Sequence, residues 1–171
     1  MIKKKGILFW IEGYSGSGKT SIAKKIKHSI LKKYGPTILI NGDDIRKIFK
    51  LKNYSKDSRF EVFKKYLFLA KLITNQNINL IFTVVGLNKK YNQLLKKNFK
   101  NLITILIQTN IKTLKKNKKN NTYKEKKNIV GLDIKPSFPK YNIIIRNDFK
   151  KNLNEISKNL SVKIKKILHH K

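Results

Sequence analysis

Residues 13–20 of the chain read Gly13-Tyr14-Ser15-Gly16-Ser17-Gly18-Lys19-Thr20 and match the pattern G-x-x-x-x-G-K-[ST]. The pattern directly follows an apolar run, Ile7–Ile11, and opens a stretch with helical spacing of apolar residues, Lys19–Tyr34. Glycines let successive backbone N–H groups curl around phosphate oxygens, and a helix N-terminus adds partial positive charge. We therefore expect this loop to bind the phosphates of a nucleoside triphosphate.

The chemistry of phosphates assigns roles to individual residues of this loop. Lys19 would reach the β and γ phosphates as a catalytic residue, and the Thr20 hydroxyl would ligate Mg²⁺. ATP and Mg²⁺ are accordingly the expected cofactors. The predicted ATP-binding residues are Gly13, Tyr14, Ser15, Gly16, Ser17, Gly18, Lys19, Thr20 and Ser21.

Outside the loop, short apolar runs alternate with stretches of helical spacing. The predicted strands are Ile7–Ile11, Thr37–Ile40, Leu80–Val85, Leu102–Ile107 and Ile143–Ile145. The predicted helices are Lys19–Tyr34, Ser58–Thr74 and the stretches 88–98, 110–117 and 149–168. Strands that are apolar on both faces and alternate with helices indicate a parallel sheet covered on both sides. The sequence thus predicts an α/β fold of the P-loop NTPase type, with a doubly wound five-stranded parallel sheet and helices on both faces.

The length of 171 residues argues for a single domain over residues 1–171. Residues 115–140 show little apolar periodicity, and because so long a loop is uncommon in a compact domain unless it is functional, we interpret it as a lid. The absence of cysteine excludes disulfides and thiolate zinc sites and fits a reducing compartment. No apolar stretch approaches the ~20 residues that span a bilayer, so we expect a cytoplasmic protein without a membrane partner.

The net charge is extreme. The chain has 41 Lys plus Arg against 9 Asp plus Glu, a formal charge of +32, and such a charge can neutralise nucleic-acid phosphates. However, only Arg46, Arg59 and Arg146 are arginine, so Lys behaves as the default residue for solvated positions. We therefore favour a Lys-coated surface and do not expect a nucleic-acid partner; a P-loop nucleic-acid-binding protein is the alternative of another class. Where Lys is the default, an Arg indicates that its particular chemistry is needed.

A second carboxylate distinguishes among P-loop proteins. The run Leu80–Val85 ends without an acid, and the guanine signature N-K-x-D is absent from the sequence. Instead, Asp43 and Asp44 follow the second predicted strand, where an Asp can orient Mg²⁺ or accept a hydroxyl proton. Asp43 is the predicted catalytic and metal-linked residue, and Asp44 is assigned to a helix N-cap, with a shared role left open. This arrangement favours a small-molecule kinase.

At this point the chain resembles the adenylylsulfate (APS) kinase family, over residues from Phe9 to about Asp148. Asn41–Arg46 is similar to the family's D-G-D-N-[VI]-R block, Tyr54–Arg59 to its F-S-x-x-D-R block, and Ile129–Asp133 to its F-T-G-I-D segment. Those enzymes transfer the γ-phosphate of ATP to the 3′-hydroxyl of adenylyl sulfate, giving 3′-phosphoadenylyl sulfate in sulfate assimilation.

The resemblance implies roles for the matching positions. Arg46 would bind the substrate anion, Tyr54 would stack on the substrate base, and Arg59 would make a second anionic contact. The predicted substrate-binding residues are Arg46, Tyr54, Arg59, Ile129 and Asp133. The expected partner is a small-molecule nucleotide, and a homodimer is left open.

Several positions depart from the family's pattern, and all lie on substrate or lid contacts. Ser58 and Val62 replace an Asp and an Asn, Ile129 replaces the aromatic that stacks on the other face of adenine, and Gly86–Lys89 replaces an S-P-[YF]-R turn. Because stacking and hydrogen bonds to adenine would be weaker, the reaction type is better supported than the substrate. Adenylyl sulfate is the first choice of acceptor, and the alternative is a cytidine diphosphoramidate-type nucleotide, which a related branch phosphorylates in polysaccharide modification.

Overall fold

A computed structural model of the chain describes residues 5–116 and 127–169, and the central part of the predicted lid, 117–126, lies outside them. Its five strands form one parallel sheet in the order β2-β3-β1-β4-β5. The strands are β1 (Leu8–Glu12), β2 (Thr37–Asn41), β3 (Asn79–Val84), β4 (Leu102–Gln108) and β5 (Ile143–Arg146). This sheet confirms the predicted fold class. Apolar runs separated by helices form parallel strands, because each helix returns the chain to the same end of the sheet.

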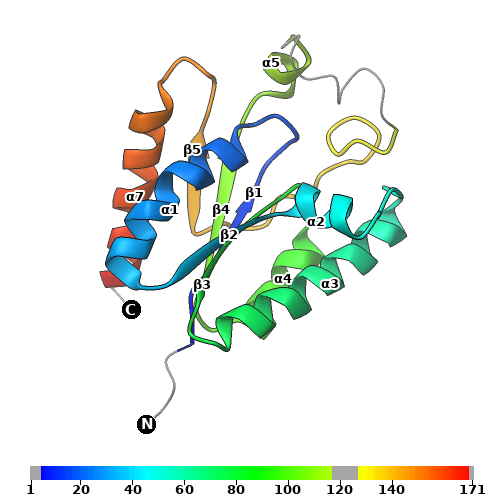
Figure 1. Cartoon of the computed structure of the whole chain (residues 1–171). Coiled ribbons are helices and arrows are strands. Elements are labelled where there is room, and N and C mark those ends of the chain that lie inside the picture. The colour runs from blue at the N-terminus through cyan, green and yellow to red at the C-terminus, as the bar shows by residue number, and fades with distance from the viewer. Residues whose placement is uncertain (1–4, 117–126, 170–171) are drawn as a thin grey trace.

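Helices cover both faces of this sheet (Figure 1). They are α1 (Lys19–Tyr34), α2 (Gly42–Ile48), α3 (Lys56–Thr74), α4 (Lys89–Asn98), α5 (Ile111–Lys116) and α7 (Leu153–His169). Successive residues of a strand point to opposite faces, which divides the core into two layers. On β1, Phe9 and Ile11 pack with α1 and α7, whereas Leu8 and Trp10 pack with α3 and α4.

The short helix α2 was not predicted, and its start corrects the assignment of the helix cap. The N-cap is Asn41, in extended conformation, and its side chain accepts a hydrogen bond from the backbone N–H of Asp43. The capping role assigned to Asp44 is therefore wrong. Asp43 and Asp44 both lie inside the first turn, where the positive end of the helix dipole stabilises carboxylates.

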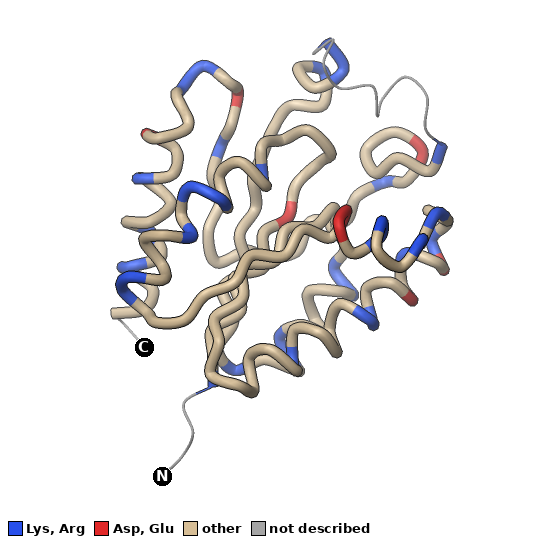
Figure 2. Tube along the Cα trace, in the orientation of Figure 1, with Lys and Arg blue, Asp and Glu red and all other residues tan. Residues whose placement is uncertain are grey.

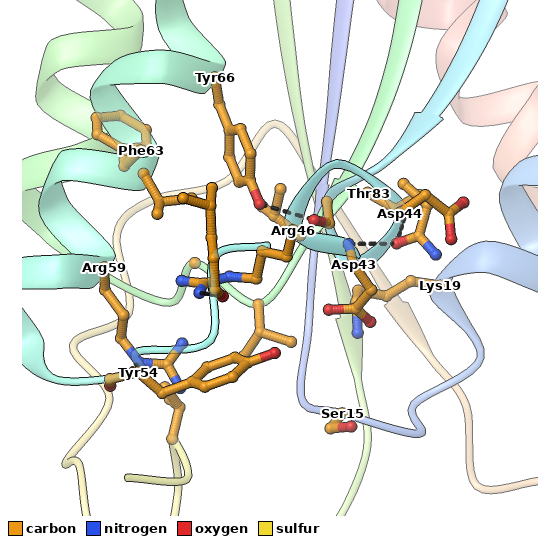
Figure 3. A pocket seen from close by; sticks show the side chains of 18 of the residues that line it. Ser15, Lys19, Asp43, Asp44, Arg46, Tyr54, Arg59, Phe63, Tyr66 and Thr83 are labelled. Carbon is orange, nitrogen blue, oxygen red and sulfur yellow. Dashed lines mark hydrogen bonds between the residues drawn. The ribbon is translucent and has the colours of Figure 1, made fainter. Parts of the chain in front are cut away.

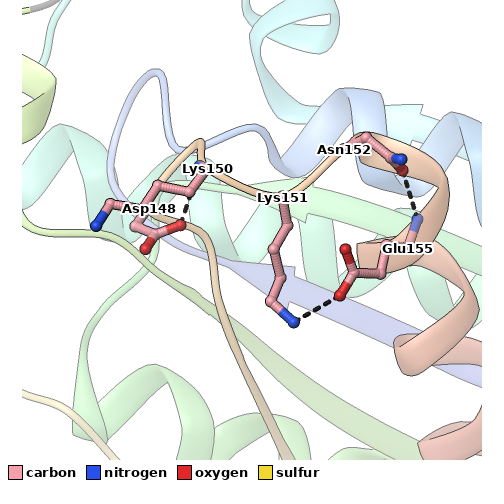
Figure 4. Close-up of polar contacts among 5 residues, drawn as sticks. All are labelled: Asp148, Lys150, Lys151, Asn152 and Glu155. Atoms are coloured by element: carbon pink, nitrogen blue, oxygen red, sulfur yellow. Dashed lines mark hydrogen bonds and ion pairs between the residues drawn. The ribbon is translucent and has the colours of Figure 1, made fainter.

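The last helix, α7, packs on the sheet and α1, with Ile156, Leu160 and Ile164 buried. Figure 4 shows how its first turn is held: the Asn152 side chain accepts from the Glu155 N–H at 2.9 Å, and Lys151 pairs with Glu155 at 2.6 Å. Both partners of that pair are exposed, so it contributes little to stability.

Charged residues avoid the sheet. The five strands contain only Glu12 and Arg146 as charged side chains, while Lys and Arg are spread over the helices of both faces (Figure 2). Among the described residues, no helix combines the length and the apolar character needed to cross a bilayer. The spread of Lys over separate surfaces agrees with the interpretation of Lys as the default solvated residue.

Candidate active site

The phosphate-binding loop connects β1 to the N-terminus of α1. Gly16 and Gly18 have φ values of 74° and 88°, which residues with a Cβ rarely adopt. Asn147, at the end of β5, donates from Nδ2 to the carbonyl oxygen of Ser17 at 2.9 Å and so fixes the last part of the loop. The loop is therefore shaped before any ligand is bound.

Lys19 lies across this loop. Its Nζ donates to the carbonyl oxygen of Tyr14 at 2.7 Å, and the residue is only 8% exposed. Burial lowers the pKa of Lys19 to about 8, while the nearby charges of Asp43 and Glu12 oppose that shift. The ammonium is thus held close to the loop's backbone, with two carboxylates supplying compensating charge.

A single cavity of about 1210 Å³ begins at this loop and continues over α2 to the start of α3 (Figure 3). It brings together most of the residues singled out in the sequence. The predicted site residues that line it are Ser15, Gly16, Gly18, Lys19, Thr20, Ser21, Asp43, Arg46, Tyr54, Arg59 and Ile129.

Four predicted site residues do not line this cavity. Gly13 and Ser17 are buried within the loop, and the Tyr14 ring turns to the other side, where it meets Phe138 edge to face at 6.3 Å. Asp133 is exposed, and its Oδ2 accepts from the backbone N–H of Ile129 at 2.8 Å. The geometry of Asp133 is therefore that of a residue shaping the turn that carries Ile129.

Asp43 occupies the middle of the cavity, in the first turn of α2. The Tyr66 hydroxyl donates to the Gly42 carbonyl oxygen at 2.7 Å and anchors the start of this helix. Figure 3 shows the Asp43 carboxylate next to Lys19, consistent with the electrostatic effect of Asp43 on the pKa of Lys19. A carboxylate here faces the end of the phosphate-binding loop.

The far wall of the cavity is built around Tyr54 and two arginines. Arg46 is 9% exposed, and its Nη1 donates to the carbonyl oxygens of Leu51 and Asn53, both at 3.0 Å. Its guanidinium lies 4.3 Å from the centroid of the Tyr54 ring. These contacts hold the guanidinium in the wall and fix the ring beside it.

Arg59 approaches the same ring from α3, with its guanidinium 5.3 Å from the centroid. Its Nε donates to the Tyr54 carbonyl oxygen at 3.0 Å, and its Nη2 donates to the Asn128 carbonyl oxygen at 2.8 Å. Burial and then the charge of Arg46 lower the pKa of Arg59. Two cations brought this close make the wall a site for an anion, because an anionic group would relieve their repulsion.

Oxygen donors for a metal ion lie between the phosphate-binding loop and the wall formed by Arg46, Tyr54 and Arg59. Thr20 supplies a hydroxyl and Asp43 a carboxylate, and no group of three or more His, Cys, Asp or Glu side chains within the described residues forms a cage. Mg²⁺ is usually held by one or two carboxylates plus substrate phosphates and water rather than by an all-protein cage. The donor set therefore fits Mg²⁺ brought with a nucleotide.

Sequence reasoning missed three residues that support the site: Glu12, Tyr66 and Asn147. Glu12 is the last residue of β1 and Asn147 directly follows β5, at the edge of the sheet that carries the loop, and this position was the available signal. Tyr66 offered no signal in the sequence, because it belongs to the apolar pattern of α3. Its hydrogen bond to Gly42 joins residues that are 24 positions apart.

Comparison with known proteins decides the family. Residues 5–140 match the sequence model of a family described as adenylylsulphate kinase. The chain belongs to the adenylylsulphate kinase family. A cytidine diphosphoramidate kinase of Campylobacter jejuni is 28% identical over 159 residues, covering 90% of this chain and 94% of that protein.

Two further comparisons bear on this adenylylsulphate kinase family member. An adenylyl-sulfate kinase of Clostridium acetobutylicum is 28% identical over 142 residues, covering 78% of this chain and 70% of that protein. The solved structure of the Mycobacterium tuberculosis APS kinase CysC in complex with AMPPNP and APS superposes with a TM-score of 0.82 at 17% identity, covering 94% of this chain and 98% of that one. The last comparison shows a shared fold. The chain is thus a nucleotide-using phosphotransferase with a hydroxyl acceptor.

Proposed function

We propose that this kinase transfers the γ-phosphate of ATP to the ribose 3′-hydroxyl of a nucleotide-activated anion. The observation that carries the proposal is the single cavity in which the phosphate-binding loop, Asp43 and the Arg46–Tyr54–Arg59 wall meet. A cation-rich wall with an aromatic ring fits a nucleotide bearing an anionic group. Asp43 lies between that wall and the loop, where a hydroxyl would approach the triphosphate.

On the donor side, the backbone of residues 13–20 would hold the triphosphate. The phosphates would take the place of the Tyr14 carbonyl oxygen as the partner of Lys19, and their charge would keep its ammonium protonated. Thr20 and Asp43 would hold Mg²⁺, which when bound offsets the charge on the phosphoryl group being transferred.

On the acceptor side, Asp43 would accept the proton of the ribose hydroxyl while the oxygen of that hydroxyl attacks the γ-phosphorus. A bond forms between that oxygen and phosphorus, and the bond from phosphorus to the β–γ bridging oxygen breaks. The products are ADP and the 3′-phosphorylated nucleotide, and the proton on Asp43 is then released to solvent.

The acceptor's base would lie against Tyr54 and Ile129. Ile129 is buried and aliphatic, so of these two contacts only Tyr54 offers an aromatic ring. Adenine, the larger base, depends more on two-sided stacking than cytosine does. The sequence motifs put adenylyl sulfate first. The aliphatic Ile129, together with the coverage of the cytidine diphosphoramidate kinase relative, leads us to place a cytidine diphosphoramidate-type acceptor ahead of it.

The proposal is tested by phosphate transfer from ATP labelled at the γ position. The purified chain is incubated with Mg²⁺ and either cytidine diphosphoramidate or adenylyl sulfate, and the 3′-deoxy form of each nucleotide serves as a matched control. Label on the cytidine nucleotide but not on its 3′-deoxy form supports the proposal. Label on adenylyl sulfate alone would identify adenylyl sulfate as the acceptor, as the sequence motifs predict.

The Lys19→Ala variant is the control for contaminating kinases. Transfer to neither nucleotide by a chain that still binds ATP would refute the ribose acceptor. ATP hydrolysis stimulated by RNA or DNA under those conditions would instead support the nucleic-acid-binding alternative.

A further inference from the structure

Glu12, the last residue of β1, is a buried carboxylate with no role in the mechanism above. It is 0% exposed and is the one acidic residue in the five described strands. Burying a charged carboxylate is costly unless it is paired or fully hydrogen-bonded. In a chain with only 9 acidic residues, such a position calls for a physical reason.

Three donors from separate segments converge on this carboxylate. Trp10 donates from Nε1 to Oε1 at 2.9 Å, the Tyr141 hydroxyl donates to Oε2 at 2.5 Å, and the backbone N–H of Leu87 donates as well. Burial raises the pKa of Glu12, and the three hydrogen bonds oppose that rise. Because each partner can donate, the arrangement satisfies the ionised form.

Two of the three donors belong to segments that form the acceptor side of the cavity. Leu87 follows Val85 and Gly86, which line the cavity, and it adopts a φ of 42°, unusual for a residue with a side chain. Tyr141 ends the segment whose first two residues, Ile129 and Val130, line the cavity. Glu12 therefore connects the strand leading into the phosphate-binding loop with two walls of the acceptor site.

The Glu12 carboxylate lies so close to Gly86 that the turn has no room for a side chain at this position. A Cβ added at Gly86 would lie 2.1 Å from Oε1 of Glu12, a distance that no side chain tolerates. The same turn is linked to the Tyr141 segment a second time, since the Ser137 N–H donates to the Leu87 carbonyl oxygen at 2.9 Å. The buried Glu12 thus accounts for a glycine at position 86 of this turn.

We propose that Glu12 is a positioning residue that holds the turn at Gly86–Leu87 and the segment Ile129–Tyr141 at the distance from the phosphate-binding loop that transfer requires. The inference rests on the proposed function in one respect, because it assumes that the acceptor binds against these walls. Glu12 acts through Leu87 and Tyr141 and does not itself touch either nucleotide.

The test uses Tyr141→Phe, which removes one donor and no packing atoms beyond the hydroxyl, with Tyr34→Phe as the matched control. Tyr34 is the last residue of α1 and is partly buried against the core layer between the sheet, α1 and α7, away from the cluster that contains Tyr141. We expect Tyr141→Phe to raise the KM for the acceptor about tenfold, the effect of one lost hydrogen bond to a charged group, and to leave the KM for ATP within about twofold. Tyr34→Phe should change neither.

The second test variant is Glu12→Gln, with Glu155→Gln as its exposed control. The amide NH2 group of the introduced glutamine cannot accept a hydrogen bond, so at least one of the three donors would lose its partner. Hydrogen–deuterium exchange of the full chain reports the coupling without any acceptor. Peptides covering 85–90 and 129–141 should exchange faster in Tyr141→Phe and Glu12→Gln, and at wild-type rates in the controls. If Glu12→Gln does not fold, Tyr141→Phe decides.

A third variant adds a rescue. Gly86→Ala should be tolerated far better in a Glu12→Ala background than alone, because the clash with Oε1 is gone.

The outcomes distinguish a failure of the proposed function from a failure of the role proposed for Glu12. A wild-type chain that phosphorylates neither nucleotide refutes the proposed function. The hydrogen–deuterium exchange rates would still test whether Glu12 holds segments 85–90 and 129–141. Unchanged exchange in both segments, or equal increases in both KM values, overturns the positioning role of Glu12.

Discussion

Replacing Arg46 by lysine tests the acceptor wall most directly, because the change keeps one positive charge and removes the planar guanidinium. Arg46 donates from one nitrogen to two carbonyl oxygens, those of Leu51 and Asn53, while its Cζ lies 4.3 Å from the Tyr54 ring centroid. A lysine ammonium is a compact charge on a flexible stem and cannot reproduce both the carbonyl contacts and the position over the ring. Tyr54 should therefore lose its fixed orientation.

The expected size of the effect follows from the two interactions that the substitution removes. One hydrogen bond contributes ~1 kcal/mol and a partly buried cation–π contact about another 1 kcal/mol, so Arg46→Lys should weaken the acceptor complex by about 2 kcal/mol. That corresponds to an increase of about 30-fold in the KM for the acceptor. The KM for ATP should stay near its original value, because the triphosphate contacts lie at residues 13–20.

Arg146→Lys is the matched control, since Arg146 is exposed at the end of β5. Steady-state kinetics with each substrate varied separately, together with the Tm of each variant, decide the question. A lowered Tm with an unchanged acceptor KM would show that Arg46 serves the fold alone and would refute the assignment. Equal effects of Arg46→Lys and Arg146→Lys on the acceptor KM would refute it as well.

Further predictions concern the donor site and base recognition. Lys19→Ala should abolish turnover, and Asp43→Asn should lower kcat by about 10²-fold or more; near-normal turnover of the latter would move its role to Asp44. Burial lowers the pKa of Lys19 to about 8. Free enzyme therefore loses this charge as pH rises through that value, whereas bound phosphates would retain it, so the KM for ATP should rise up to about tenfold per pH unit above the pKa. A KM for ATP that stays flat to about pH 9.5 would contradict this. Ile129→Phe should shift the ratio of kcat/KM values toward adenylyl sulfate by about 2- to 10-fold, the effect of one added aromatic contact; an unchanged ratio would place the base elsewhere.

Local patterns in the sequence determined the phosphate-binding loop and the α/β fold. The loop is a run of consecutive residues whose glycines and lysine have direct chemical meaning, and the five strands are continuous apolar runs. The order of the elements then restricts the sheet, because short connections through helices enforce parallel strands. Arg46 and Arg59 were also visible, since arginine is rare in this chain.

Tertiary structure alone decided how distant residues meet. Helix α2 spans only seven residues, too few for a periodic apolar signal, and its cap is an Asn in the preceding strand end. Tyr141 and Glu12 are separated by 129 residues and form a hydrogen bond only because β5, which follows Tyr141, pairs with β4, and β4 pairs with β1. Such contacts depend on strand order and on burial, which no local pattern encodes, whereas the loop consists of consecutive residues that the sequence reveals directly.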